Sequence, residues 1–215
     1  MSRYRTVLWD LDGTIADTLP LIRDSLRHAA VQVLGAAPPE DVLVRNIFMP
    51  LADQMRAFDA ERVDDLCAAY LEWNHAVSRE RLGAHDGMVD LVRDLAAAGV
   101  AQGIASSKSR RGVALALEIL GLEDVFGAVV TPDEVEAHKP DPAPLLRALE
   151  LMGRGQDGAC YVGDALTDVA AARAAGVDAI SVVWGFYDAE ALAGAEPDAV
   201  AHTAADLRTI LGLAA

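Results

Sequence analysis

The sequence predicts an α/β fold of the Rossmann-like kind: a doubly wound parallel sheet of five strands with an all-α domain inserted after the first strand. Three observations indicate this fold. Short apolar runs recur along the chain, helix-like stretches lie between the later runs, and a long helical interval separates the first run from the second. Strands that alternate with helices are typical of a parallel sheet covered by helices.

The strand candidates are short and mostly bounded by Gly, Asp, Ser or Pro, as buried parallel strands tend to be. They are TVLW at 6–9, QGIA at 102–105, GAVV at 127–130, ACYV at 159–162 and AISVVW at 179–184. The later runs alternate with stretches of helical periodicity, each ending at a glycine suited to a helix C-terminal cap. These helix candidates cover 109–121, 143–153 and 166–176.

The interval between the first two strand candidates is too long for one crossover helix. It contains amphipathic patterns at 19–35, 51–58 and 59–83, and the pattern at 87–99 is the expected crossover helix. We therefore expect a helical domain at 16–84, with the α/β core formed by 1–15 and 85–215. The segment GAAPPEDV at 35–42 is interpreted as a turn inside the inserted domain.

The composition limits the classes of partner. The formal net charge is −15 and the sequence pI is about 4.6, which argues against nucleic acid or an anionic membrane as a partner. No signal-peptide pattern or long apolar segment is evident, so we expect a cytoplasmic protein, either a monomer or a homodimer. Cys67 and Cys160 are expected to be free thiols, as in a reducing compartment.

Four polar segments directly follow strand candidates. They are DLDGT at 10–14, SSKS at 106–109, HKPDP at 138–142 and GDALTD at 163–168. In an open α/β sheet, ligands bind beyond the carboxyl ends of the strands, so we expect all four segments to meet at one edge.

The residue types in these segments favour phosphate chemistry with a metal ion. A cluster of four carboxylates requires a cation or protons, and its expected members are Asp10, Asp12, Asp164 and Asp168. Oxygen ligands with no nearby His or Cys favour Mg²⁺, which commonly works with a substrate phosphate. Ser106 and Lys139 are phosphate-binding groups by chemical type.

The placement of lysine supports this interpretation. The 18 basic residues are 16 arginines and two lysines, Lys108 and Lys139, and both lysines lie in the polar segments. The compact charge of lysine suits a phosphoryl oxygen. Each segment alone has an ordinary explanation as a turn or a helix cap, but their order and their shared position after strands favour a common site.

Taken in order, these four motifs resemble those of the haloacid dehalogenase superfamily of phosphohydrolases, in the branch with a helical cap domain. The chain is similar in particular to phosphoglycolate phosphatase-like enzymes, through DGTIADT, KPDPAPLLRALELMG and the segment at 184–200. The resemblance implies a Mg²⁺-dependent phosphomonoester hydrolase that acts on a small phosphorylated metabolite through an aspartyl-phosphate.

The resemblance also implies roles for the acidic residues. Asp10 is the expected nucleophile, and Asp12 is the expected general acid and base. Mg²⁺ is expected to be held by Asp10, the backbone carbonyl of Asp12 and Asp164, with Asp168 in support. Asp12 argues against dehalogenation, because a halide leaving group needs no proton.

Ser106 and Lys139 are expected to hold the phosphoryl oxygens. Ser107, also an expected phosphate-binding residue, stands where phosphoglycolate phosphatase-like enzymes usually have asparagine. In the helical domain, Phe48 stands where their cap loop usually has glycine, and Arg45 and Arg56 flank that loop. These three are the candidates for substrate specificity, although surface arginines are more often solvated residues on a helix face.

Other activities are considered alongside hydrolysis. A phosphonoacetaldehyde hydrolase would need a cap lysine, and 16–84 contains none. A sugar-phosphate mutase resembling β-phosphoglucomutase stays open, although such enzymes usually have a histidine soon after the first motif, where this chain reads ADTLPLIRD. A binding protein that keeps the fold without turnover is the third alternative, and the presence of Asp12 argues against it.

Overall fold

The structure, a computed structural model, describes residues 3–45, 47 and 49–213. The chain divides into two compact units. One joins the residues up to Asp17 with those from Gly83 onward, and the other is Thr18–Leu82.

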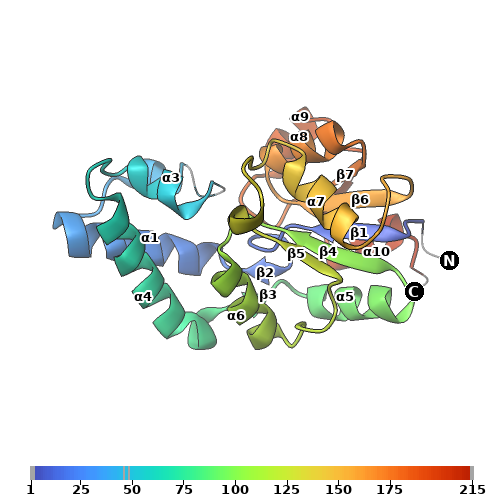
Figure 1. The fold of residues 1–215 in the computed structure, drawn as a ribbon, viewed down its shortest axis with the longest axis horizontal. Helices are drawn as coiled ribbons and strands as arrows, with labels where there is room; N and C mark the ends of the chain where they lie inside the picture. The colour runs from blue at the N-terminus through green and yellow to red at the C-terminus, as the bar shows by residue number, and fades with distance from the viewer. Residues whose placement is uncertain (1–2, 46, 48, 214–215) are drawn as a thin grey trace. The chain divides into compact units, whose positions relative to one another are not determined.

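The first unit is built on a parallel six-stranded sheet with the order β5–β4–β1–β6–β7–β8 (Figure 1). Its strands are β1 (Thr6–Trp9), β4 (Ala101–Ala105), β5 (Ala128–Val130), β6 (Ala159–Gly163), β7 (Asp178–Val182) and β8 (Ala199–Ala201). The central strand β1 pairs with β4 and β6, so that Leu8 lies between Gly103 and Tyr161. A sheet that winds outward from its first strand in both directions is the doubly wound arrangement, which confirms the predicted fold class.

The predicted number of strands was wrong, because β8 adds a sixth. It has only three residues and pairs with the edge of β7, where Ile180 faces Ala199 and Val182 faces Ala201. A run this short gives no periodic signal, and its pairing depends on the sheet that is already present. A further antiparallel pair, β2 (Ala16–Asp17) and β3 (Gly83–Ala84), joins the two stretches of chain that form this unit.

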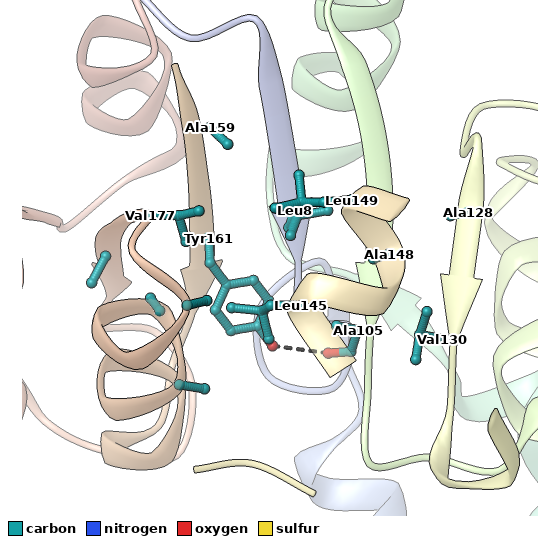
Figure 2. Packing of buried hydrophobic residues seen from close by; sticks show 14 of the residues in the cluster. Leu8, Ala105, Ala128, Val130, Leu145, Ala148, Leu149, Ala159, Tyr161 and Val177 are labelled. Carbon is teal, nitrogen blue, oxygen red and sulfur yellow. Dashed lines mark hydrogen bonds between the residues drawn. The ribbon is translucent and has the colours of Figure 1, made fainter. Parts of the chain in front are cut away.

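One face of the sheet packs against α7 (Ala143–Leu151) and α8 (Leu166–Ala175). Figure 2 shows Leu8 of β1 and Tyr161 of β6 with Leu145 and Leu149 of α7 in this buried cluster. The Tyr161 hydroxyl donates a hydrogen bond of 2.8 Å to the carbonyl of Ala105, so the phenol joins β6 to the end of β4. The packing of this cluster and the Tyr161 hydrogen bond therefore hold the ends of β4 and β6 in place, and polar segments follow both strands.

Figure 1 shows α5 (Met88–Ala97) and α6 (Arg110–Leu120) on the other side of the sheet from α7 and α8. Two buried side-chain hydrogen bonds connect β1 and β4 with α5. The Trp9 indole donates to the side-chain oxygen of Gln102 at 3.0 Å, and the Gln102 amide donates to the carbonyl of Val92 at 2.8 Å. The remaining helices of this unit are the 3₁₀ helix η1 (Pro132–Glu134), α9 (Ala189–Gly194) and α10 (Ala204–Ile210).

The second unit is helical. It contains α1 (Leu19–Leu34), α2 (Glu40–Val44), α3 (Leu51–Arg56) and α4 (Val63–Arg81). α1 packs along α4, and Leu26, Met55 and Leu66 are fully buried in its core. The segment 35–42 is not only a turn as predicted, because α2 begins at Glu40, where Pro39 precedes two acidic residues that favour a helix N-terminus.

None of the helices that the structure describes combines the length and apolar composition needed to span a bilayer. Cys67 and Cys160 are both free thiols, as expected, and Cys160 is fully buried.

Candidate active site

Three of the four polar segments directly follow strands of the sheet. Asp10 follows β1, Ser106 follows β4 and Asp164 follows β6. Lys139 does not follow its strand directly as predicted, because the capped turn of η1 intervenes and places it in the loop before α7. The loop still brings its ammonium to the end of β1.

Lys139 lies at the centre of the site. Its Nζ donates to Asp168 Oδ1 at 2.7 Å and to the Tyr161 hydroxyl at 2.8 Å, and it lies 3.2 Å from Asp10 Oδ1. The side chain is only 5% exposed. Burial alone would lower the pKa of Lys139, but Asp10 and Asp168 together raise it above its ordinary value. Lys139 is therefore a fixed positive charge among buried carboxylates.

Asp10, Asp164 and Asp168 form the acidic cluster, in which one carboxylate oxygen of each lies within 4.8 Å of the others. Burial, reinforced by the neighbouring carboxylates, raises the pKa of Asp10 to about 7 and that of Asp164 to about 8. Lys139 opposes this increase at Asp10. One ammonium does not balance three carboxylates, so the cluster has the charge of a cation site.

Hydrogen bonding around Asp164 and Asp168 fits a metal centre. Asp164 accepts from the Thr14 hydroxyl at 3.1 Å and from the Phe186 N–H at 2.7 Å, one donor to each oxygen, so lone pairs are left for a cation. Asp168 has both oxygens occupied, by the N–H of Ala165 and by Lys139, which suits a supporting role.

Asp10 provides a further indication of a cation. Its Oδ1 is buried and accepts no hydrogen bond from the described residues, although Lys139 is within ion-pair distance. The Lys139 ammonium offsets part of the cost of burying this oxygen, and a metal ion would offset more of it. The donor set is oxygen only, which is the set that hard divalent cations prefer.

Glycines let the backbone approach these carboxylates. A Cβ added to Gly13 would lie 2.4 Å from Asp164 Oδ2, and one added to Gly185 would lie 2.2 Å from the same atom. Gly13 also has a φ of 78°, a conformation that favours glycine. A Cβ at Gly163 would come within 2.3 Å of Asp168 Oδ2. Gly185 was not among the predicted site residues, although it lies in the segment 184–200 that resembles phosphoglycolate phosphatase-like enzymes.

The predicted cluster of four carboxylates was wrong in one member, because Asp12 lies outside the group formed by Asp10, Asp164 and Asp168 and is paired with a different lysine. The Asp12 carboxylate accepts two hydrogen bonds from Lys108 Nζ, at 3.0 Å and 3.2 Å. Lys108 was absent from the predicted site residues, although its position in a polar segment pointed to it. Each of the two lysines thus binds a different aspartate of the DLDGT segment.

The predicted phosphate-binding serines lie near Lys139. Ser106 is buried, and its Oγ accepts a 3.2 Å hydrogen bond from the Lys108 backbone N–H. A small pocket is lined by both serines and Lys139; its other lining residues are Thr131, Pro132, Val135, His138 and Pro144. The structure therefore brings the three predicted phosphate-binding residues to one pocket.

The predicted specificity residues belong to the helical unit. Arg45 pairs with Asp41 at 3.1 Å and Arg56 pairs with Asp53, both across exposed helix surface. Phe48 lies outside the described residues. A role of these residues in specificity stays a prediction.

The parallel sheet, the inserted helical unit and the buried acidic centre at the strand ends define an α/β protein with a candidate metal site beyond the carboxyl ends of its strands. The model of the haloacid dehalogenase-like hydrolases matches residues 7–182, and the chain belongs to this family. The family predicted from the four motifs is thereby confirmed.

Relatives match nearly the whole length of the chain. It is 33% identical over 208 residues to "Pyrophosphatase PpaX" of Anoxybacillus flavithermus, covering 97% of each chain. It is 34% identical over 212 residues to the protein of the same name from Bacillus velezensis, covering 98% of each. A solved structure described as a predicted phosphoglycolate phosphatase from Haemophilus somnus shares the fold, with a TM-score of 0.88 over 98% of this chain and 99% of that one at 19% identity.

Proposed function

We propose that this phosphatase is Mg²⁺-dependent, acts in the cytoplasm on a small phosphorylated metabolite, and forms an aspartyl-phosphate on Asp10. The observation that carries the proposal is the position of Asp10, which is buried at the end of β1, 3.2 Å from Lys139 and within the acidic cluster. The unit Thr18–Leu82 is the proposed cap domain of this enzyme.

In the proposed reaction, a carboxylate oxygen of Asp10 attacks phosphorus and the bond from phosphorus to the leaving oxygen breaks. Asp12 gives its proton to the leaving oxygen. Water then attacks the phosphorus of the aspartyl-phosphate, Asp12 takes a proton from it, and the Asp10 carboxylate is released with inorganic phosphate. Ser106, Ser107 and Lys139 hold the phosphoryl oxygens.

Mg²⁺ would be held by the carboxylates of Asp10 and Asp164 and the backbone carbonyl of Asp12, with Asp168 in support. When bound, it would reduce the repulsion between the attacking carboxylate and a phosphate dianion. The raised pKa values of Asp10 and Asp164 support this assignment, because a cation is the natural replacement for the protons that these groups retain.

The names of the relatives add a second candidate substrate. Proteins named pyrophosphatase are similar to this chain over nearly its whole length, so inorganic pyrophosphate joins 2-phosphoglycolate as a leading candidate. A screen of phosphorylated metabolites with and without Mg²⁺ tests the proposal. Hydrolysis of one or more substrates that requires Mg²⁺ is expected, and an enzyme that is fully active after chelation would contradict the metal assignment.

Exchange of Asp12 for asparagine is expected to affect substrates unequally. A side chain that cannot donate or accept the proton should cost about 10²–10⁴-fold in kcat for an alkyl phosphate. The loss should be smaller for p-nitrophenyl phosphate, whose leaving group departs without full protonation. Steady-state kinetics on both esters measure the difference, with the exposed Asp124→Asn as the control. Equal losses on both esters would argue against proton transfer by Asp12.

Stabilisation by Mg²⁺ is expected to grow with pH. Because burial raises the pKa values of Asp10 and Asp164 to about 7 and about 8, the folded chain binds protons more tightly than the unfolded chain. Without metal, the free energy of unfolding should therefore fall as the pH rises from about 4 through about 8. Mg²⁺ competes with these protons, so the increase in melting temperature that it causes should be larger at about pH 8.5 than at about pH 5.5.

Thermal denaturation in EDTA and in MgCl₂ at both pH values measures this increase. The variant Asp164→Asn should lose most of it, since one proposed ligand is then a neutral amide. An increase that is the same at both pH values, or that is unchanged in the variant, would refute the assignment of the acidic cluster as the metal site.

A further inference from the structure

Lys108 and Asp12 form an ion pair that joins the loops after β4 and β1, two neighbouring strands of the sheet. Asp12 lies in the loop after β1, and Lys108 lies between β4 and the start of α6. The ammonium donates to both carboxylate oxygens, at 3.0 Å and 3.2 Å. The two side chains are 11% and 20% exposed, so the pair is better shielded from water than an ordinary surface ion pair.

Two features of the chain fix the position of Lys108. Its backbone N–H donates to Ser106 Oγ at 3.2 Å, which holds the loop after β4. Its aliphatic stem lies over Gly112 in the first turns of α6, where an added Cβ would be 2.9 Å from Cγ and 3.0 Å from Cε of the lysine. A residue with a side chain at 112 would displace the stem, so glycine at this position makes room for the lysine.

The two lysines bind different aspartates of the first motif. Lys139 lies with Asp10 and Asp168 in the acidic cluster, whereas Lys108 binds Asp12. A carboxylate that transfers protons must stay within hydrogen-bond reach of the reacting oxygen, and a displacement of about 1 Å is enough to cost on the order of 10² in rate. The ammonium occupies part of the hydrogen-bonding capacity of Asp12 and leaves further lone pairs for a proton.

We propose that Lys108 is a positioning residue for proton transfer, which holds the Asp12 carboxylate in place for the leaving group and for water. The inference rests on the proposed function, because it takes Asp12 as the general acid and base. Lys108 acts through Asp12 and not on the substrate, so its loss should lower kcat and leave KM unchanged.

The test uses Lys108→Met, Lys108→Arg and Gly112→Ala in the full chain with Mg²⁺. Rates are measured on an alkyl phosphate that the enzyme hydrolyses and on p-nitrophenyl phosphate. Arg111→Met is the matched control, because it removes an exposed cation from the same end of α6. Melting temperatures of all variants show whether the fold is intact.

Lys108→Met should lower kcat on the alkyl phosphate by about 10–100-fold and on p-nitrophenyl phosphate by only a few-fold, with both KM values unchanged. Lys108→Arg should recover part of the rate, because a cation is kept beside Asp12. Gly112→Ala should shift the ratio of the two rates in the same direction without lowering the melting temperature, since alanine favours a helix more than glycine does.

Equal losses on the two esters, or a raised KM at unchanged kcat, would overturn the proposal; the second result would mean that Lys108 binds the substrate. Rates unchanged by Lys108→Met, in an enzyme that Asp10→Asn inactivates, would overturn the role of Lys108 and leave the proposed function intact. Full activity of Asp10→Asn would instead contradict the proposed function itself.

Discussion

Asp10→Asn is expected to reduce turnover of p-nitrophenyl phosphate in the presence of Mg²⁺ by at least about 10⁴-fold. The amide is a poor nucleophile and a poor ligand for a divalent cation, so one substitution removes both proposed contributions of the side chain. The remaining groups, Lys139 and the serines, would still bind phosphate. The loss should therefore be in kcat, measured by steady-state kinetics, and not mainly in KM.

The folded state should tolerate this substitution. Burial raises the pKa of Asp10 to about 7, so ionising it in the folded chain is already unfavourable, and a neutral amide of similar size removes that cost. Urea denaturation in EDTA at about pH 8 should show a free energy of unfolding at least as high as that of the wild type. Wild-type rates in the Asp10→Asn protein would refute the mechanism.

Lys139→Met is expected to have the largest effect on stability. The substitution removes a cation that is only 5% exposed and leaves Asp10 and Asp168 buried without it. Breaking a buried ion pair in this way typically costs about 3–5 kcal/mol. We expect the free energy of unfolding to fall by this amount at about pH 8 without metal. We also expect loss of turnover, because the proposed phosphate-binding lysine is then absent.

The pH dependence separates this cause from general damage to the fold. As the pH falls to about 5, Asp10 and Asp164 take up protons, so the difference in stability between Lys139→Met and the wild type should narrow. Arg110→Met, which breaks the exposed pair with Glu134, is the control and should cost less than about 1 kcal/mol. A Lys139→Met protein as stable as the wild type at about pH 8 would show that the ammonium does not offset the acidic cluster.

The sequence predicted the parts of this structure that depend on local patterns. The strands from β1 to β7 in the main sheet lie within a few residues of the apolar runs, because buried parallel strands need continuous apolar residues. Strand β8 was missed, since its three residues pair only with an existing edge. Helix α2 was missed for a similar reason, because its five residues are too few for a periodic pattern.

The site could be predicted as a set of residues but not as a set of contacts. The order of the polar segments placed Asp10, Ser106 and Asp164 at the ends of strands, as the structure shows. The pair between Lys108 and Asp12 could not be predicted, because it depends on how two loops converge. The approach of Gly185 to Asp164 is likewise a property of the folded chain, although the glycine itself is visible in the sequence.

The most direct test of the account is to look for the phosphoryl group on Asp10 during turnover. The enzyme is quenched in acid while it hydrolyses a substrate, digested, and its peptides are analysed by mass spectrometry. The proposed mechanism predicts one phosphoryl group on the peptide that contains Asp10 in the wild type and none in Asp10→Asn. Steady turnover with that peptide unmodified, or with the phosphoryl group on another residue, would contradict the central claim.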